Sequence, residues 1–168
     1  MGADEIFFGY RRHKAILLAE KYKKIPFAIR TLITRLIEAL PVKRGRKGLR
    51  LFRWARRFAS FANLSTEEAY MRSYSYYSQH EMQQLFKDDI TKEYEWLSNQ
   101  HRHIFNQCYK TDLVNQICHT DIHLFMQGLN LSYTDRASMA ASVEVRVPFI
   151  DKEVIELAMK ITGKLKYR

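Results

Sequence analysis

Two stretches of the sequence hold the residue types that polar chemistry needs. The first is GADE at residues 2–5, where two carboxylic acids follow two small residues. The second is TDRASMAASVEVRVPFID at residues 134–151, where charged side chains stand among small and apolar ones. Small residues let a ligand or another backbone come close, and charges among apolar neighbours have to be paired. Both stretches are therefore candidate parts of a polar site.

Each stretch also has a plainer interpretation. Asp4 and Glu5 could belong to a solvated terminus, or they could suit a magnesium ion that bridges phosphates. The charges of the second stretch could form a structural network of ion pairs or line a ligand site. The residues alone leave both alternatives open. The candidates in the second stretch are Asp135, Arg136, Ser138, Glu144, Arg146 and Asp151.

Two histidine patterns suggest metal sites at first sight. His80 and Glu81 begin like the zinc motif H-E-x-x-H, but position 84 is Gln, so the second ligand is missing. His119 and His123 are four residues apart, a spacing that can bind zinc on one helix. No third ligand is evident beside them, and two ordinary imidazoles are the favoured interpretation.

Composition indicates one folded domain. The chain has 168 residues, of which 46% are hydrophobic and 13% aromatic. No apolar run approaches the roughly 20 residues that a membrane span needs. A signal peptide is not expected, because Asp4 and Glu5 stand where its basic region would lie. The chain has two cysteines, which favours a reducing, cytoplasmic location over a disulfide framework.

The net charge of +10 comes almost entirely from one segment. Residues 28–62 contain ten Lys or Arg and one acid, Glu38, and so carry +9. Such a segment could bind nucleic acid, an anionic membrane or a partner chain. A solvated basic face is the favoured interpretation, and nucleic acid is not the favoured partner.

The spacing of apolar residues predicts a mainly α-helical chain without internal repeats. Ser65, Asp112 and Asp151 each stand where a helix cap is expected, and Gly163 is expected to close the last helix. The run VEVRVPFI at 143–150 resembles a strand but contains a proline. Helices are expected over 28–40, where Pro41 would end the helix, over 49–62 after a loop at 42–48, from 66, over 92–107, from 112 and from 151.

Taken together, the two stretches resemble a known family. The order GADE-hydrophobic-F-x-GYRR, followed more than a hundred residues later by LNLSYTDRASMAASVEVRVPFID, is similar to the synthetase domain of glutamine-hydrolysing asparagine synthases. The likeness is strong at both ends of the chain and only general in the middle.

The resemblance implies a fold and a reaction. The fold would be the helical portion of an adenine-nucleotide alpha-hydrolase-like α/β domain, a PP-loop ATPase, whose sheet lies upstream. The reaction would be asparagine biosynthesis by a carbon–nitrogen ligase and amidotransferase, with aspartate and glutamine as substrates and ATP and Mg²⁺ as cofactors. Aspartate would be activated as an aspartyl-adenylate, and ammonia from glutamine would complete the amide.

The resemblance also assigns roles to residues of this sequence. Asp4 corresponds to the family's magnesium-ligating aspartate. The other matching positions would line or brace the cleft for substrate and pyrophosphate, without any of them being assigned as catalytic: they are Gly2, Glu5, Asp135, Arg136, Ser138, Glu144 and Arg146.

The sequence departs from the family pattern in several places. Met1 stands where the family has an acid near the reacting groups, and Gln127 stands where relatives often have proline. The glutaminase domain, the S-G-G-x-D-S nucleotide loop and a later lysine-bearing segment are not found in these 168 residues. Residues 1–168 are therefore interpreted as a C-terminal fragment of the synthetase domain that is inactive alone and could pair with a complementary fragment.

Two other hypotheses come from different classes. One is a basic helical binding module that acts through residues 28–62. The other is a gene remnant without a function. A chain separated from its sheet is expected to expose apolar surface.

Overall fold

The structure is a computed structural model that describes residues 1–39, 50–108 and 111–167. The chain divides into two compact units: residues 1–13 with 91–168, and residues 14–90. Every regular element in the described ranges is helical and none is a strand, so the prediction of a mainly α chain is confirmed there.

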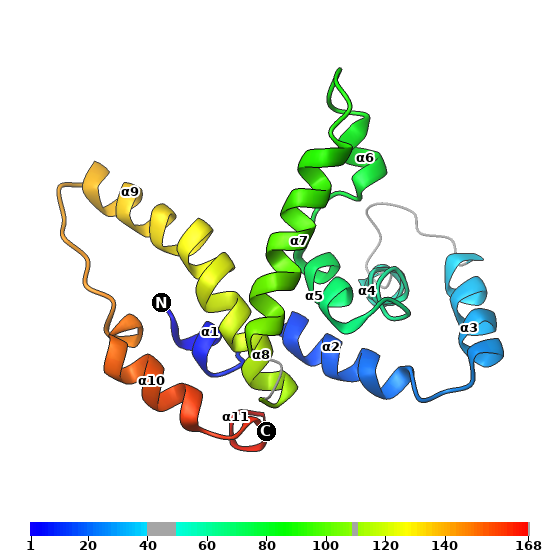
Figure 1. Ribbon diagram of the computed structural model, residues 1–168, viewed down its shortest axis with the longest axis horizontal. Helices are drawn as coiled ribbons and strands as arrows, with labels where there is room; N and C mark the ends of the chain where they lie inside the picture. The colour runs from blue at the N-terminus through cyan, green and yellow to red at the C-terminus, as the bar shows by residue number, and fades with distance from the viewer. Residues whose placement is uncertain (40–49, 109–110, 168) are drawn as a thin grey trace. The chain divides into compact units, whose positions relative to one another are not determined.

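The first unit is built around one long helical rod (Figure 1). The rod consists of α8, the π-helix η1 and α9, and the backbone stays helical at both junctions, Asp121 and Ser132. α1 packs on α8 and η1, and α7 and α11 contact α8. α10 packs on η1 through Ala158, which is buried with Ile122 and Met126. The elements are α1 (Ala3–Ile6), the start of α2 (Arg11–Tyr22), α7 (Thr91–Gln107), α8 (Leu113–Thr120), η1 (Asp121–Leu131), α9 (Ser132–Ala140), the 3-10 turn η2 (Pro148–Ile150), α10 (Lys152–Lys160) and α11 (Gly163–Lys166).

Apolar side chains from three distant segments form the core of this unit. Ile6 of α1, Met126 of η1 and Ala158 of α10 are buried together. Two caps set where the surrounding helices begin. Asp112 accepts a hydrogen bond from the backbone N–H of Asn115, and Asp151 accepts one from Glu153, as the sequence predicts.

The second unit contains the rest of α2 together with α3 (Phe27–Ala39), α4 (Arg50–Ala59), α5 (Thr66–Tyr74) and α6 (Gln79–Gln83). Ser65 caps α5 through the N–H of Glu68, which confirms the predicted start at residue 66. Ser78 and Glu81 form a reciprocal capping box at α6. Glu81, which follows His80 in the rejected zinc motif, therefore stabilises the start of α6.

An aromatic cluster joins the helices of the second unit. The Phe58 ring contacts Tyr22 and Phe61 edge-on and stacks on Trp54 at 6.0 Å. The outer side of α3 is also apolar: Leu32 is 59% and Leu36 is 61% exposed. Apolar side chains are therefore exposed on α3.

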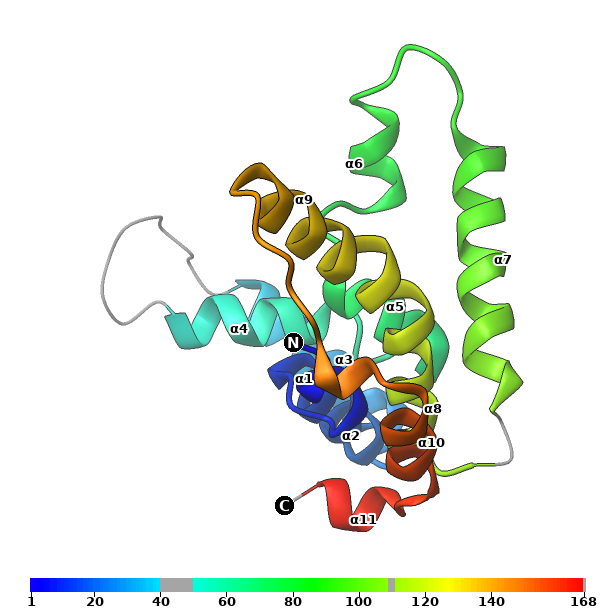
Figure 2. The same cartoon turned by 90° about the vertical axis from the view of Figure 1, so that its left-hand side faces the viewer.

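Three predicted details need correction or lie outside the described residues. Gly163 does not close the last helix, because α10 ends at Lys160 and Gly163 begins α11. The strand-like run at 143–150 makes no sheet: it is a single chain without regular structure that leads into the 3-10 turn (Figure 2). Leu40, Pro41 and the predicted loop at 42–48 lie outside the described residues.

Candidate functional site

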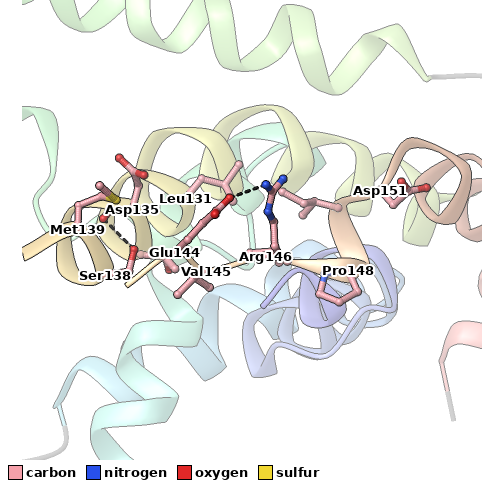
Figure 3. Close-up of a pocket in the computed structure, with 12 residues that line it drawn as sticks. Leu131, Asp135, Ser138, Met139, Glu144, Val145, Arg146, Pro148 and Asp151 are labelled. Carbon is pink, nitrogen blue, oxygen red and sulfur yellow. Dashed lines mark hydrogen bonds and ion pairs between the residues drawn. The ribbon is translucent and has the colours of Figure 1, made fainter. Parts of the chain in front are cut away.

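A pocket of about 570 Å³ lies between α9 and the chain that returns toward α10. α9 and the returning chain approach the pocket from two sides (Figure 3). Its lining residues are Leu131, Thr134, Asp135, Ser138, Met139, Glu144, Val145, Arg146, Val147, Pro148, Ile150 and Asp151. The structure thus brings together four of the cleft residues that the sequence suggested.

The polar groups of the pocket are held by weak, solvent-exposed interactions. Arg146 pairs with Glu144 at 2.5 Å, but both side chains are largely exposed, at 87% and 71%. An ion pair so open to water contributes little to stability. The Ser138 hydroxyl donates to the backbone carbonyl of Asp135 at 3.0 Å. This arrangement favours a ligand-accessible site over a structural ion-pair network.

Arg136 lies on another side of α9. It lines a separate pocket of about 500 Å³ together with Tyr133 and Gly128. Adjacent residues of an α-helix are turned by about 100° from one another, so Arg136 cannot share the side of Asp135. The structure does not bring Arg136 into the pocket with the other cleft candidates.

The start of the chain borders the pocket. Gly2 is buried, with a φ of +93°, and a Cβ there would lie 3.1 Å from the side chains of Phe149 and Ile150. Only glycine adopts this backbone conformation readily. The Thr134 hydroxyl contacts the Met1 sulfur at 3.1 Å. Because Thr134 and Ile150 line the pocket, Met1 and Gly2 stand at its edge.

Asp4 presents an exposed carboxylate beside the backbone of Gly9. A Cβ on Gly9 would lie 1.9 Å from the Asp4 Oδ1 atom, so a side chain at residue 9 would force this carboxylate to move. The Gly9 N–H donates to the Asp4 backbone carbonyl at 2.9 Å. One exposed carboxylate fits Mg²⁺, which keeps several waters and takes one or two carboxylates together with phosphates. In the described ranges, no group of three or more His, Cys, Asp or Glu residues could hold a metal by itself.

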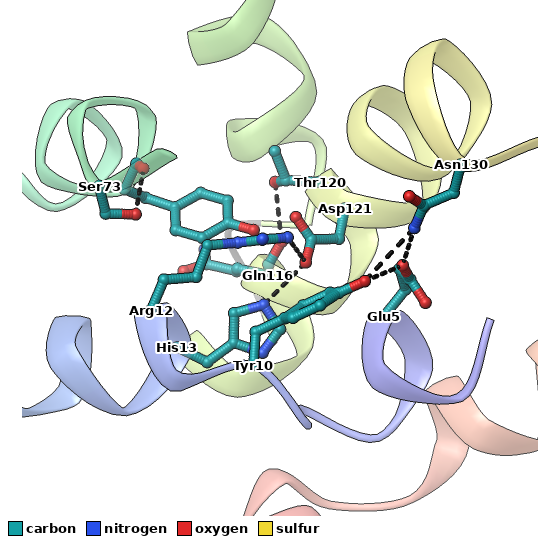
Figure 4. Close-up of polar contacts among 10 residues, drawn as sticks. Glu5, Tyr10, Arg12, His13, Ser73, Gln116, Thr120, Asp121 and Asn130 are labelled. Atoms are coloured by element: carbon teal, nitrogen blue, oxygen red, sulfur yellow. Dashed lines mark hydrogen bonds and ion pairs between the residues drawn. The ribbon is translucent and has the colours of Figure 1, made fainter. Parts of the chain in front are cut away.

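Glu5, the next residue, is buried and only 1% exposed. Its Oε1 atom accepts hydrogen bonds from the Tyr10 hydroxyl at 2.5 Å and from the Asn130 amide (Figure 4). Burial and the bond to Glu5 raise the pKa of Tyr10 to about 12. Glu5 is therefore held inside the protein and does not line the pocket that contains Asp135.

Asp121 forms a second buried polar cluster nearby. Its Oδ2 atom lies 2.8 Å from Arg12 Nη2 and 2.7 Å from His13 Nε2. The Arg12 guanidinium also lies over the rings of Tyr10 and Phe125, at 4.0 and 4.1 Å. Sequence reasoning did not single out these residues. The available signal was Asp121 next to an apolar helical run, since a buried acid must be paired.

The histidine pair remains an unconvincing metal site. The rings of His119 and His123 lie 4.3 Å apart, edge to face. Burial and the neighbouring His123 lower the pKa of His119.

The two free cysteines differ in burial. Cys118 is buried, and burial raises the pKa of its thiol to about 12, whereas Cys108 is half-buried.

Two arginines of the basic segment at residues 28–62 donate hydrogen bonds within the protein. Arg57 donates to the backbone carbonyls of Arg72, Ser73 and Ser75 at the end of α5. Arg30 donates to the Asn63 side chain at 2.8 Å. Binding through residues 28–62 stays a prediction. Among the described helices, none has the length and apolar character that crossing a bilayer requires.

Comparison with known sequences identifies the family. The family described as "Asparagine synthase" matches residues 1–168, the whole chain. The chain therefore belongs to the asparagine synthase family, and the resemblance found in its two motifs is confirmed.

Individual relatives agree with this assignment. The chain is 28% identical over 170 residues to asparagine synthetase [glutamine-hydrolyzing] 1 of Bacillus subtilis (strain 168), covering 98% of this chain. It is 27% identical over 168 residues to a protein of Mycobacterium bovis that is provisionally named asparagine synthetase [glutamine-hydrolyzing], again over 98% of the chain. The alignments cover 24% of the length of each relative. No solved structure matches the chain.

Proposed function

We propose that the chain forms part of an ATP-dependent asparagine synthase. The single observation that carries the proposal is the family match over all 168 residues. The pocket adds support, because it gathers Asp135, Ser138, Glu144 and Arg146 from two separate segments. The parent reaction would activate the side-chain carboxylate of aspartate with ATP and then form the amide with ammonia derived from glutamine.

The chain's own residues would act by electrostatics and position. Asp4 would hold Mg²⁺, which would supply positive charge to the phosphates of ATP. Arg146 is a cation at the pocket that could attract an anionic substrate group, and its pairing with Glu144 is open enough to be exchanged for one. Asp135 and Glu144 could accept hydrogen bonds from a substrate ammonium group. Gly2 would let the backbone approach the cleft closely.

The fold proposal follows from the same assignment. The helices would be one side of an α/β domain of the PP-loop ATPase type, with residues 1–168 as the C-terminal part of its synthetase region. Exposed apolar side chains support a missing neighbour, since Leu157 and Leu165 are each 64% exposed. The chain spans about a quarter of the length of its curated relatives, and we infer that it is inactive alone.

Two experiments test the proposal. The purified 168-residue chain is expected to make no asparagine from aspartate, ATP, Mg²⁺ and ammonia, as measured by chromatography of the amino acids. A chimera in which this chain replaces the matching segment of the Bacillus subtilis relative is expected to restore asparagine formation. In that chimera, Asp4→Asn and Arg146→Ala should each lower activity at least about tenfold.

A matched surface substitution controls for general damage. Lys152 is 88% exposed on α10 and lies outside the pocket. Lys152→Ala should leave the activity of the chimera unchanged. A chimera that folds but makes no asparagine would count against the proposal, as would equal losses for Lys152→Ala and Arg146→Ala.

A further inference from the structure

Two buried carboxyl groups join the start of the chain to η1, and each of the two segments supplies one of them. Glu5 of α1 accepts a hydrogen bond from the side-chain amide of Asn130, which lies near the end of η1. Asp121, at the beginning of η1, pairs with the side chains of Arg12 and His13. Each segment thus supplies a carboxyl group to donors on the other. These contacts connect segments more than a hundred residues apart in the sequence.

The contacting residues of η1 recur with an unusual spacing. Asp121, Phe125 and Asn130 all meet residues 10–13 or Glu5, with steps of four and five residues. The Phe125 and Tyr10 rings are in contact, with their centroids 5.6 Å apart.

A second row of η1 repeats this spacing one residue further along. Ile122 and Met126 belong to the same buried cluster as Ile6, and Leu131 packs against it. The steps in this row are again four and five residues. Two adjacent rows with the same steps show that the winding of the whole element, and not one local distortion, sets which residues face residues 5–13.

An ordinary α-helix could not make these contacts. Nine residues of an α-helix make about two and a half turns, so Asn130 would face away from the side of Asp121. The observed rows correspond to about 4.5 residues per turn, the wider winding of a π-helix with i→i+5 bonds. The π-helix is therefore what brings Asn130 to Glu5.

We propose that Glu5, Tyr10 and Asn130 are positioning residues for the pocket, and that η1 sets the register that joins them. The inference rests on the proposed function, in which Asp4 holds Mg²⁺. Asp4 precedes Glu5 on α1, and Asp135 follows Asn130 by five residues on the same rod. The buried contact fixes the helix that carries Asp4 to the helix that carries Asp135.

Helix geometry provides a sharp test. An α-helix needs about seven residues for two turns, where η1 uses nine. Gln127 and Gly128 are both exposed, and a Cβ at Gly128 would meet no atom within 4 Å. Deleting both residues leaves seven steps between Asp121 and Asn130, which restores their common side with α winding. Deleting Gly128 alone leaves eight steps, which turns Asn130 aside by roughly 80°.

The first readout is amide hydrogen exchange in α1. The N–H groups of Ile6, Phe7 and Gly9 bond within residues 2–9 and report whether this turn is held. Asn130→Ala and the single deletion should speed their exchange at least about tenfold, the factor expected when a hydrogen bond to a charged group is lost. The double deletion should keep exchange at the wild-type rate.

Further variants separate the network from general damage. Tyr10→Phe removes the hydroxyl that bonds to Glu5 and keeps the ring, so it should also speed amide exchange in α1. This variant tests the network without a deletion, and so it remains usable if the single-deletion protein fails to fold. Asn106→Ala, at an exposed asparagine of α7, should change nothing. The proposal is overturned if Asn130→Ala leaves α1 exchange unchanged, or if the double deletion exchanges as fast as Asn130→Ala.

The second readout is Mn²⁺ titration of the same proteins in the presence of pyrophosphate, with Mn²⁺ as the probe for the magnesium site. Asn130→Ala should weaken Mn²⁺ binding several-fold, and the double deletion should restore it. A purely structural role would lower thermal stability without this pattern of loss and rescue, and that result would refute positioning. Asp4→Asn should abolish binding. A wild-type chain without Mn²⁺ binding would refute the role of Asp4, whereas the exchange rates would still decide the register.

Discussion

The Nε2 atom of His13 lies 2.7 Å from the Oδ2 atom of Asp121, with the two side chains 0% and 1% exposed. The same oxygen lies 2.8 Å from Arg12 Nη2. The His13 ring also packs against the Phe8 ring, with centroids 4.6 Å apart. A carboxylate so deeply buried is tolerated because these donors compensate its charge. The start of α2 is thereby anchored to the start of η1.

Removing this charge should be costly. Asp121→Asn leaves the Arg12 guanidinium without its counter-charge and is expected to lower the free energy of unfolding by about 3 kcal/mol. Urea unfolding followed by circular dichroism measures the loss. Glu144→Gln is the matched control, since it breaks an ion pair open to water and should cost less than about 1 kcal/mol. Equal losses for the two variants would contradict the assigned role of burial.

The caps at helix N-termini were the most predictable part of the fold. Ser65, Asp112 and Asp151 were each placed correctly, because capping depends on a short polar side chain and the backbone immediately after it. The pocket residues on 135–146 were also predictable as a group from the motif that contains them. Arg136 was not separable from its neighbours, since its direction depends on the helix phase of α9.

The buried clusters were not predictable, for a physical reason. Apolar spacing was read with the 3.6-residue period of an α-helix, whereas η1 winds more widely. That error in phase hides Asn130 and Asp121 from any pattern drawn along one face. The buried position of Glu5 was also not predictable, because its partner Asn130 lies far away in the sequence.

Gly163 packs too closely to accept a side chain. Its N–H donates to Asp112 Oδ2 at 3.0 Å, and an added Cβ would lie 2.2 Å from Asp112 Oδ1 and 2.6 Å from Val114 Cβ. Gly163→Ala is expected to cost about 1–3 kcal/mol in urea unfolding, because α11 must move away from the cap of α8. Gly128→Ala provides the comparison: its Cβ enters open space, so stability should stay the same or rise by up to about 1 kcal/mol. A neutral Gly163→Ala would show that α11 is not held by Asp112.

Arg57 should stabilise the second unit as a cap. Its Nη2 atom donates to three carbonyls at the end of α5, and burial is the main cause that lowers its pKa. Arg57→Ala is expected to lower the free energy of unfolding by about 1–3 kcal/mol, because those carbonyls lose a charged donor. Arg53, exposed on the same helix, is the control, and Arg53→Ala should stay within about 0.5 kcal/mol. If instead Arg53 and Arg57 behave alike, α4 uses its arginines only as a solvated basic face.

His101 should make the first unit sensitive to mild acid. Its ring is buried on α7 and stacks on Phe105, and burial lowers the pKa of His101 to about 4. Between pH 6.5 and 4 the unfolded chain takes up a proton at this residue and the folded chain does not, so stability falls as the pH falls through that range. His101→Gln should flatten this part of the curve of unfolding free energy against pH. His103→Gln, at an exposed histidine of the same helix, should leave the slope as in the wild type. The same slope in all three proteins would mean that His101 is not kept neutral by burial.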